Sequence, residues 1–263
     1  MIRILFLGDV FGKPGRRAVH QLLPSLRREL QVDFCVANAE NAAAGAGITP
    51  DSAEELFASG VDVLTGGNHT WDRREGLSVV ENDLRVLRPA NYPEGVPGRG
   101  VGLYPCHGEQ IAVVSLIGRI FLPAVDCPFQ GIDRILESLG GVTPLVLIDF
   151  HAEATSEKVA MGWYLDGRVS VLIGTHTHVQ TGDERILPRG TAYMTDAGMT
   201  GPHDSIIGVR KELALDRFLR HLPVKFQPAE EDIRLQGLWI RCDPATGRAL
   251  EVQRIQRSLE DMG

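Results

Sequence analysis

The segment from Val169 to His178 constrains the fold and function of this chain more than any other stretch. It begins with a short run of apolar, mostly β-branched residues ending at Gly174, a pattern typical of a buried strand. His176 and His178 follow, and side chains two residues apart on an extended chain point the same way. Both imidazoles are therefore expected to reach one point beyond the strand's carboxyl end, where α/β sheets usually bind ligands. The pair predicts a metal site, and the alternative is two polar loop histidines without a ligand.

Four other apolar segments also end in residues that can bind metals. Strands are expected over residues 2–7, 32–37, 61–65 and 144–149. The residues that follow them, in chain order, are Asp9, Glu40, Asn41, Asn68, His69 and His151. Chance would scatter such residues over strand starts and helix surfaces as well. Their common position therefore indicates one site on one rim of the sheet.

The chemistry of this set favours a pair of metal ions. Carboxylate, amide and imidazole ligands suit iron, manganese, zinc or magnesium rather than copper(I) or an iron–sulfur cluster. The ligands outnumber what one ion needs, and a carboxylate shared by two ions ~3.5–4 Å apart explains the surplus. Such a pair makes hydroxide from a bridging water near neutral pH and neutralises phosphoryl oxygens, which points to phosphate ester hydrolysis. His69 is then placed to protonate the leaving oxygen.

Each member of the set also has a purely structural explanation. The alternatives are a helix cap for Asp9, a solvated loop acid for Glu40, a turn residue for Asn41 or Asn68, and a hydrogen-bonded core histidine for His151. His69 could equally be a ligand instead of an acid. Taken together, the shared position at strand ends favours the metal centre over these separate explanations.

Helical and strand-like segments alternate along the chain. Residues 16–30 have helical spacing of apolar residues, and Pro24 predicts either a kink or an early second helix start. Thr49 is expected to cap a second helix. Residues 235–242 and 249–255 are expected to form a closing antiparallel pair. This order predicts the α/β class and a four-layer α/β/β/α sandwich of mixed sheets.

The sequence shows no interdomain linker. We therefore expect a single domain over residues 1–263. The proline- and glycine-rich segment at about 86–108 is expected to form a loop or a cap over a cleft.

Composition limits the classes of function. The 263 residues carry a formal net charge of −7, which argues against a broad electrostatic grip on nucleic acid. The four cysteines include no Cys-x-x-Cys pair, so we expect a reduced cytoplasmic setting and no thiolate zinc site. No apolar run approaches the ~20 residues that span a bilayer, so no membrane partner is expected. Gly12, Lys13, Gly15 and Arg16 could cradle a phosphate near a helix start, although they form no nucleotide P-loop.

The order of these motifs resembles that of the calcineurin-like metallophosphoesterases. The similar blocks are Gly8-Asp9, Gly67-Asn68-His69 and Gly174-Thr175-His176-Thr177-His178. Two departures, Phe11 in place of a histidine and Ala39-Glu40-Asn41 in place of Gly-Asp, resemble one branch, the YmdB-like phosphodiesterases. The resemblance covers nearly the whole chain and includes the longer blocks Asp149 to Lys158 and Thr195 to Pro202.

The resemblance implies a di-metal phosphodiesterase, often loaded with iron, that acts on 2′,3′-cyclic nucleotides. By this resemblance one ion is held by Asp9, Glu40, Asn41 and His178, and Glu40 bridges to a second ion completed by Asn68, His151 and His176. His69 is the implied proton donor. Members of this branch tend to self-associate, so a homo-oligomer is expected.

Two other functions stay open at this point. One is a phosphomonoesterase built on the same scaffold. The other is a nucleotide- or RNA-binding regulator that retains the metal site, and the net charge leaves short RNA open as a partner.

Overall fold

Two β-sheets form the centre of the structure, a computed structural model that describes residues 1–262. The first sheet has the strand order β2 (Asp9–Val10), β12 (Met199–Pro202), β13 (Ile233–Cys242), β1 (Ile2–Leu7), β3 (Phe34–Asn38), β4 (Val63–Thr65) and β5 (Val86–Leu87), with β14 (Ala249–Ser258) paired to β13. The second sheet has the order β10 (Arg185–Ile186), β11 (Ala192–Met194), β9 (Val171–Thr175), β8 (Val146–His151), β7 (Glu109–Ile117) and β6 (Val101–Cys106).

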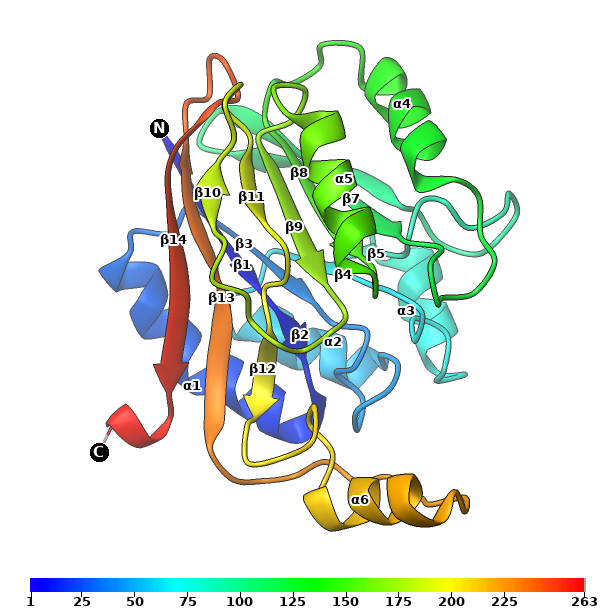
Figure 1. The fold of residues 1–263 in the computed structure, drawn as a ribbon. Coiled ribbons are helices and arrows are strands. Elements are labelled where there is room, and N and C mark those ends of the chain that lie inside the picture. Colours follow the sequence, from blue (N-terminus) through cyan, green and yellow to red (C-terminus); the bar gives the residue numbers. More distant parts are fainter. Residues whose placement is uncertain (263) are drawn as a thin grey trace.

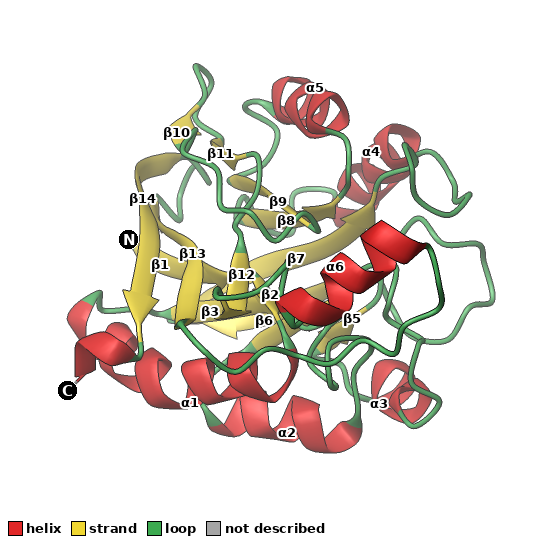
Figure 2. Ribbon diagram, turned by 60° about the horizontal axis from the view of Figure 1, so that its bottom comes forward, coloured by secondary structure: helices red, strands yellow, loops and turns green. Residues whose placement is uncertain are grey.

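Helices cover the outer face of each sheet, so the fold has four layers (Figure 2). The helices on the first sheet are α1 (Gly12–Glu29) and α2 (Pro50–Ala58), and those on the second are α4 (Pro128–Leu139) and α5 (Thr155–Leu165). Strand β1 shows how the layers are packed, because its successive side chains point to opposite faces. Leu5 and Leu7 belong to the core beneath α1, whereas Ile4 and Phe6 belong to the core between the sheets. The predicted α/β class and four-layer sandwich are confirmed.

Four adjacent strands of the first sheet and three of the second run parallel, which aligns their carboxyl ends. In the first sheet β1, β3, β4 and β5 run parallel, and Asn38 lies beside Thr65. In the second sheet β7, β8 and β9 run parallel, and His151 lies beside Thr175. A hydrogen bond between Asn38 and Asp149 shows that these two edges adjoin. Strand β13, from the last part of the chain, lies antiparallel to β1 in the middle of the first sheet.

The helix starts agree with the sequence pattern only in part. Thr49 caps α2 by accepting the N–H of Ser52 at 3.3 Å, and a proline follows it at the first helical position. Helix α1 instead begins at Gly12, four residues earlier than expected, and continues through Pro24. Pro14 lies in the first turn of α1, where a helix needs no N–H donor, so a segment that resembles a loop is helical.

The segment at about 86–108 is more regular than its composition suggests. The expectation of a loop is wrong for its two ends, because β5 closes one edge of the first sheet and β6 pairs antiparallel with β7. Pro105 lies in β6, which is the edge strand of the second sheet. An edge strand tolerates proline because its outward N–H has no partner strand.

Three further helical elements complete the fold (Figure 1). They are α3 (Gly76–Asn82), α6 (Lys211–Arg220) and the short 3-10 helix η1 (Glu260–Met262). Helix α6 stands out from the body, with Ala214 as its one buried residue and Phe218 and Leu219 exposed by 69% and 80%. Within residues 1–262, none of the helices combines the length and the apolar character needed to cross a bilayer.

Candidate metal centre

The carboxyl ends of five parallel strands bring seven ligand-type side chains together. They are Asp9 after β1, Glu40 and Asn41 after β3, Asn68 after β4, His151 at the end of β8, and His176 and His178 after β9. Asp9, Glu40, Asn41 and His151 are buried, and the other three are partly exposed. Buried polar groups are costly without partners, so the contacts among them decide what the site can bind.

His151 is the centre of a first cluster. Its Nε2 lies 3.0 Å from Asn68 Oδ1, 2.9 Å from His176 Nδ1 and 3.1 Å from Glu40 Oε1. A ring nitrogen carries at most one proton, yet two of these three neighbours are oxygens that can only accept. Glu40, His151 and His176 each offer a ligand atom within 4.8 Å of the others. Electron-rich atoms gathered around one point fit a bound cation better than they fit hydrogen bonds alone.

Asp9, Asn41 and His178 form a second cluster beside the first. Asn41 Nδ2 lies 3.1 Å from His178 Nε2 and 3.2 Å from Glu40 Oε1. His178 Nε2 lies 3.7 Å from Asp9 Oδ1. Within the described residues Asp9 Oδ1 is buried and receives no hydrogen bond. A buried carboxylate oxygen without a donor costs free energy unless a cation faces it, so this cluster also fits a metal ion.

The charges in these clusters perturb the pKa values of their members. Burial raises the pKa of Glu40 and lowers that of His151, but their mutual attraction outweighs it and brings the pKa values to about 2 and about 9, respectively. Burial and repulsion by His151 lower the pKa of His176 to about 3. Burial raises the pKa of Asp9. A proton on His151 therefore occupies the place that a cation would take, and metal binding has to displace it.

His176 and His178 do not lie on an extended chain. Strand β9 ends before them, and their φ angles are +101° and +64°, in the left-handed region that side-chain-bearing residues rarely adopt. The predicted alternation is therefore wrong, and the two rings join different clusters. Tertiary hydrogen bonds hold this strained loop, because Asp9 Oδ2 accepts the N–H of His176 and Asp196 Oδ2 accepts that of Thr177, both at 3.1 Å.

His69 lies next to the first cluster through its backbone. Its N–H donates to Glu40 Oε2 at 2.9 Å, whereas its ring Nδ1 lies 2.6 Å from Asp72 Oδ2. The His69 side chain is 39% exposed, unlike that of the fully buried His151. Its ring is thus held by a carboxylate and remains accessible from solvent.

Residues 5–255 match the model of one protein family, described as YmdB-like protein. The chain belongs to the YmdB-like protein family. Over 254 residues it is 48% identical to a 2′,3′-cyclic-nucleotide 2′-phosphodiesterase from Bacillus subtilis (strain 168), covering 97% of this chain and 96% of that protein. The resemblance seen in the sequence motifs is confirmed.

Two solved structures are similar to this YmdB-like chain over nearly its full length. A hypothetical protein from Thermus thermophilus superimposes with a TM-score of 0.93 at 43% identity, covering 98% of this chain and 99% of that one. A structure described as a novel phosphatase from Mycoplasma pneumoniae gives a TM-score of 0.92 at 34% identity, covering 98% and 93%.

Several polar residues that support the YmdB-like site were missed by the sequence analysis. Asn38, Thr65, Asp149 and Thr175 form a buried hydrogen-bonded group next to His151. Their signal in the sequence is weak, since each is a single polar residue at or near the end of an apolar strand. A further contact comes from the loop after β8, where Glu153 Oε2 lies 3.1 Å from His176 Nε2.

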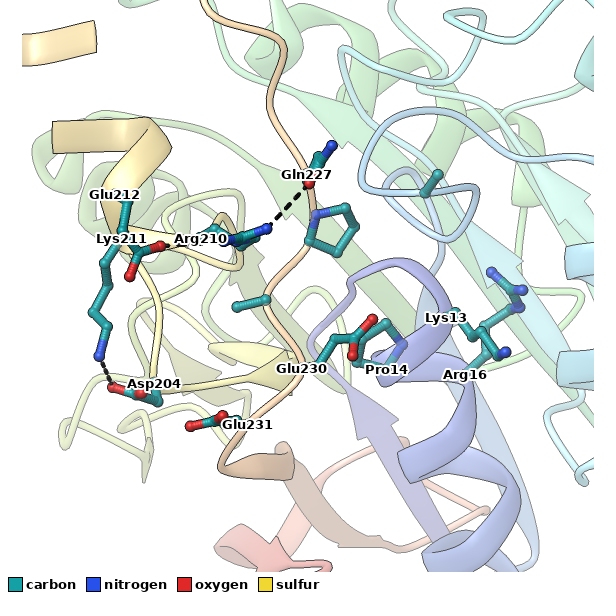
Figure 3. Close-up of a pocket in the computed structure, with 13 residues that line it drawn as sticks. Lys13, Pro14, Arg16, Asp204, Arg210, Lys211, Glu212, Gln227, Glu230 and Glu231 are labelled. Atoms are coloured by element: carbon teal, nitrogen blue, oxygen red, sulfur yellow. Dashed lines mark hydrogen bonds and ion pairs between the residues drawn. The ribbon is translucent and has the colours of Figure 1, made fainter. Parts of the chain in front are cut away.

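The phosphate cradle considered near the start of α1 is separate from this site. Lys13 and Arg16 line a cavity of about 770 Å³ between α1 and the chain that precedes β13 (Figure 3). Glu230 and Glu231 line the same cavity, and Arg16 is already paired with Glu55 at 2.5 Å. None of the seven ligand-type residues lines it. Its mixed charge gives no preference for a phosphate.

Proposed function

We propose that this chain is a di-metal phosphodiesterase that hydrolyses 2′,3′-cyclic nucleotides to nucleoside monophosphates. The observation that carries the proposal is the convergence of seven ligand-type side chains at five strand ends. In particular, His151 Nε2 faces three further ligand atoms at about hydrogen-bond distance. The substrate class comes from the Bacillus subtilis relative, whose name states that activity.

The two clusters correspond to two proposed metal positions. One ion would be held by Asp9, Asn41 and His178, and the other by Asn68, His151 and His176, with Glu40 as the bridge. Contacts of Glu40 Oε1 with Asn41 Nδ2 at 3.2 Å and His151 Nε2 at 3.1 Å support the bridging position. Bound metal ions would neutralise phosphoryl oxygens and lower the pKa of water. We propose iron as the native metal, with manganese, magnesium and zinc compatible with the same ligands.

His69 is the proposed general acid. Breaking the bond between phosphorus and the 2′ oxygen requires a proton at that oxygen, and the accessible ring of His69 can deliver it. Asp72, whose Oδ2 lies 2.6 Å from Nδ1, holds the ring in place. The backbone hydrogen bond from His69 to Glu40 fixes its distance from the metal clusters.

Replacement of His69 tests both the role and the function. With 2′,3′-cyclic AMP as substrate, His69→Ala is expected to keep its metal content and lose turnover by ~10²–10⁴-fold, the range for a general acid. His107→Ala is the matched control, because that histidine is 66% exposed and pairs with Asp33 away from the site. Full activity of His69→Ala would refute the acid role. Metal-loaded wild-type protein that binds but does not hydrolyse cyclic nucleotides would refute the function and favour a nucleotide- or RNA-binding regulator.

A phosphomonoesterase is the second candidate function. The name of the Mycoplasma pneumoniae structure, a phosphatase, favours it, and the same two clusters would serve that reaction. Comparing turnover on 2′,3′-cyclic AMP and on AMP separates the two functions. The phosphodiesterase proposal predicts faster turnover of the cyclic substrate, and the reverse order would favour the phosphomonoesterase.

We further propose that the chain self-associates. Exposed apolar side chains on α6, including Phe218 and Leu219, support this because such a patch usually marks an interaction surface. Light scattering is expected to give a mass above the 28.8 kDa of one chain. A mass of one chain at all concentrations would contradict this part of the proposal.

A further inference from the structure

Asp149 is a buried carboxylate that the proposed reaction does not use. Its side chain is fully inaccessible to solvent, and among the described residues no lysine or arginine pairs with it. Three donors reach it instead: Asn38 Nδ2 at 2.9 Å, Thr65 Oγ1 at 2.5 Å and Thr175 Oγ1 at 2.7 Å. These donors come from β3, β4 and β9, so the carboxylate joins both sheets at the base of the metal centre. Burying a carboxylate is costly, and these three hydrogen bonds offset part of that cost.

The hydrogen bonds around Asp149 have a fixed direction on the Asn38 side. The Oδ1 of Asn38 accepts the N–H of Glu40 at 3.1 Å, which leaves its Nδ2 facing Asp149. An amide nitrogen can only donate, so Asp149 Oδ2 must accept. The carboxylate therefore acts as an acceptor at the centre of this group.

On the Thr175 side, the hydrogen bonds place a proton on His151. Thr175 has one hydroxyl proton, and it points to Asp149 Oδ1 at 2.7 Å. The Thr175 oxygen also lies 2.9 Å from His151 Nδ1, and having used its proton it can only accept there. Nδ1 of His151 must then carry a proton. The other ring nitrogen, Nε2, is left to face Asn68, His176 and Glu40.

We propose that Asp149, acting through Thr175, keeps a proton on His151 Nδ1 and so presents Nε2 to the metal centre. This makes Asp149 and Thr175 positioning residues, and the inference rests on the metal site of the proposed function. A histidine ligand commonly donates its second N–H to a carboxylate or another acceptor, which fixes the ring and its tautomer. Here a threonine hydroxyl connects the ring to the carboxylate.

A purely structural role for Asp149 makes a different prediction. If its hydrogen bonds only tie the sheets together, loss of the Thr65 bond and loss of the Thr175 bond should have equal effects on metal binding. If Thr175 also orients His151, only its loss should weaken metal binding. The two threonines are a matched pair, because each is buried and each donates to one oxygen of the same carboxylate.

The experiment compares Thr175→Val with Thr65→Val in purified metal-free protein. Mn²⁺ affinity is measured by competition with a chelator, and the free energy of unfolding is measured by urea titration. Thr175→Val is expected to bind Mn²⁺ about 10–100-fold more weakly than wild type, which is the range for loss of a hydrogen-bond partner of a metal-binding histidine. Thr65→Val and the conservative variant Thr175→Ser are expected to stay within about threefold of wild type. Both valine variants are expected to lose similar stability, because each removes one buried hydroxyl.

Two outcomes would overturn the inference. Equal Mn²⁺ affinities in the two valine variants would mean that Asp149 only holds the two sheets together. A Thr175→Ser variant that fails to restore Mn²⁺ affinity would mean the same. Asp149→Asn gives a second measure. Its amide nitrogen is a donor and cannot accept the hydrogen bonds that the carboxylate accepts, so this variant should also bind Mn²⁺ more weakly. The proposed function is tested separately by turnover of 2′,3′-cyclic AMP by wild-type protein with saturating Mn²⁺. Failure of that assay alone would leave the ranking of affinities intact.

Discussion

The ion pair between Lys158 and Asp196 provides the sharpest test of how the histidine loop is held. Lys158 Nζ lies 2.6 Å from Asp196 Oδ2, and both side chains are 1% exposed. The same carboxylate accepts the N–H of Thr177 at 3.1 Å and its hydroxyl at 2.8 Å. Gly198 donates to the other oxygen at 2.9 Å. The variant Lys158→Met keeps the apolar stem and removes the charge, so Asp196 loses its cation but keeps three neutral donors.

The expected loss of stability follows from this geometry. Breaking a buried pair by removing one partner costs about 3–5 kcal/mol, because the remaining charge stays buried. Three remaining donors partly compensate Asp196, so we expect the lower end, about 3 kcal/mol. For a chain of this size about 1 kcal/mol shifts Tm by about 2–4 °C, so Tm should fall by about 6–12 °C.

The assay is urea unfolding of metal-free protein, followed by circular dichroism. Arg241→Met is the control, because its pair with Glu251 is exposed by 37% and 53% and is expected to contribute about 0–1 kcal/mol. The double variant Lys158→Met/Asp196→Asn should be less destabilised than the sum of its single changes, because no unpaired charge remains buried. A loss below about 1 kcal/mol in Lys158→Met, equal to that of the control, would refute the reasoning.

Two further predictions concern the metal centre. A Cβ at Gly67 would lie 2.3 Å from Glu40 Oε2 and 2.4 Å from His151 Cδ2, so Gly67→Ala is expected to lose bound metal, and elemental analysis showing wild-type metal content would contradict this. The pKa of His151 is raised to about 9, so metal binding displaces a proton below that pH. The Mn²⁺ association constant should therefore rise with pH, by up to about tenfold per unit, and level off above about pH 9. Calorimetry in buffers of different ionisation enthalpy would detect the released proton, and an affinity that is flat between about pH 7 and pH 8.5 would contradict the assignment.

The positions of the candidate ligands could be predicted from the sequence because they depend on a simple rule. Parallel strands place their carboxyl ends at one edge, so Asp9, Glu40 and His151 were expected to meet, and their side chains lie together in the structure. The cap at Thr49 could also be predicted, because a threonine followed directly by a proline is a local signal for a helix start.

Features that depend on contacts distant in sequence could not be predicted. The left-handed backbone at His176 requires Asp9, 167 residues away, to accept its N–H. The role of Thr175 depends on Asp149 in the neighbouring strand, and a threonine at a strand end carries no local sign of it. The start of α1 was missed because glycine and proline at Gly12 and Pro14 favour turns, whereas in the structure this helix packs against β12 and β13.

The place of β13 in the first sheet bears on how the chain is made. Residues 233–242 pair with β1 and β12 along one edge and with β14 along the other, so the second edge of β1 stays open until these residues have been made. All seven candidate ligands lie before residue 179, yet the sheet that carries Asp9, Glu40, Asn41 and Asn68 is completed last. During synthesis an unpaired strand edge invites pairing with other chains. The hairpin of β13 and β14, which holds no ligand, therefore covers the strand edge of β1 that would otherwise be free to pair with other chains.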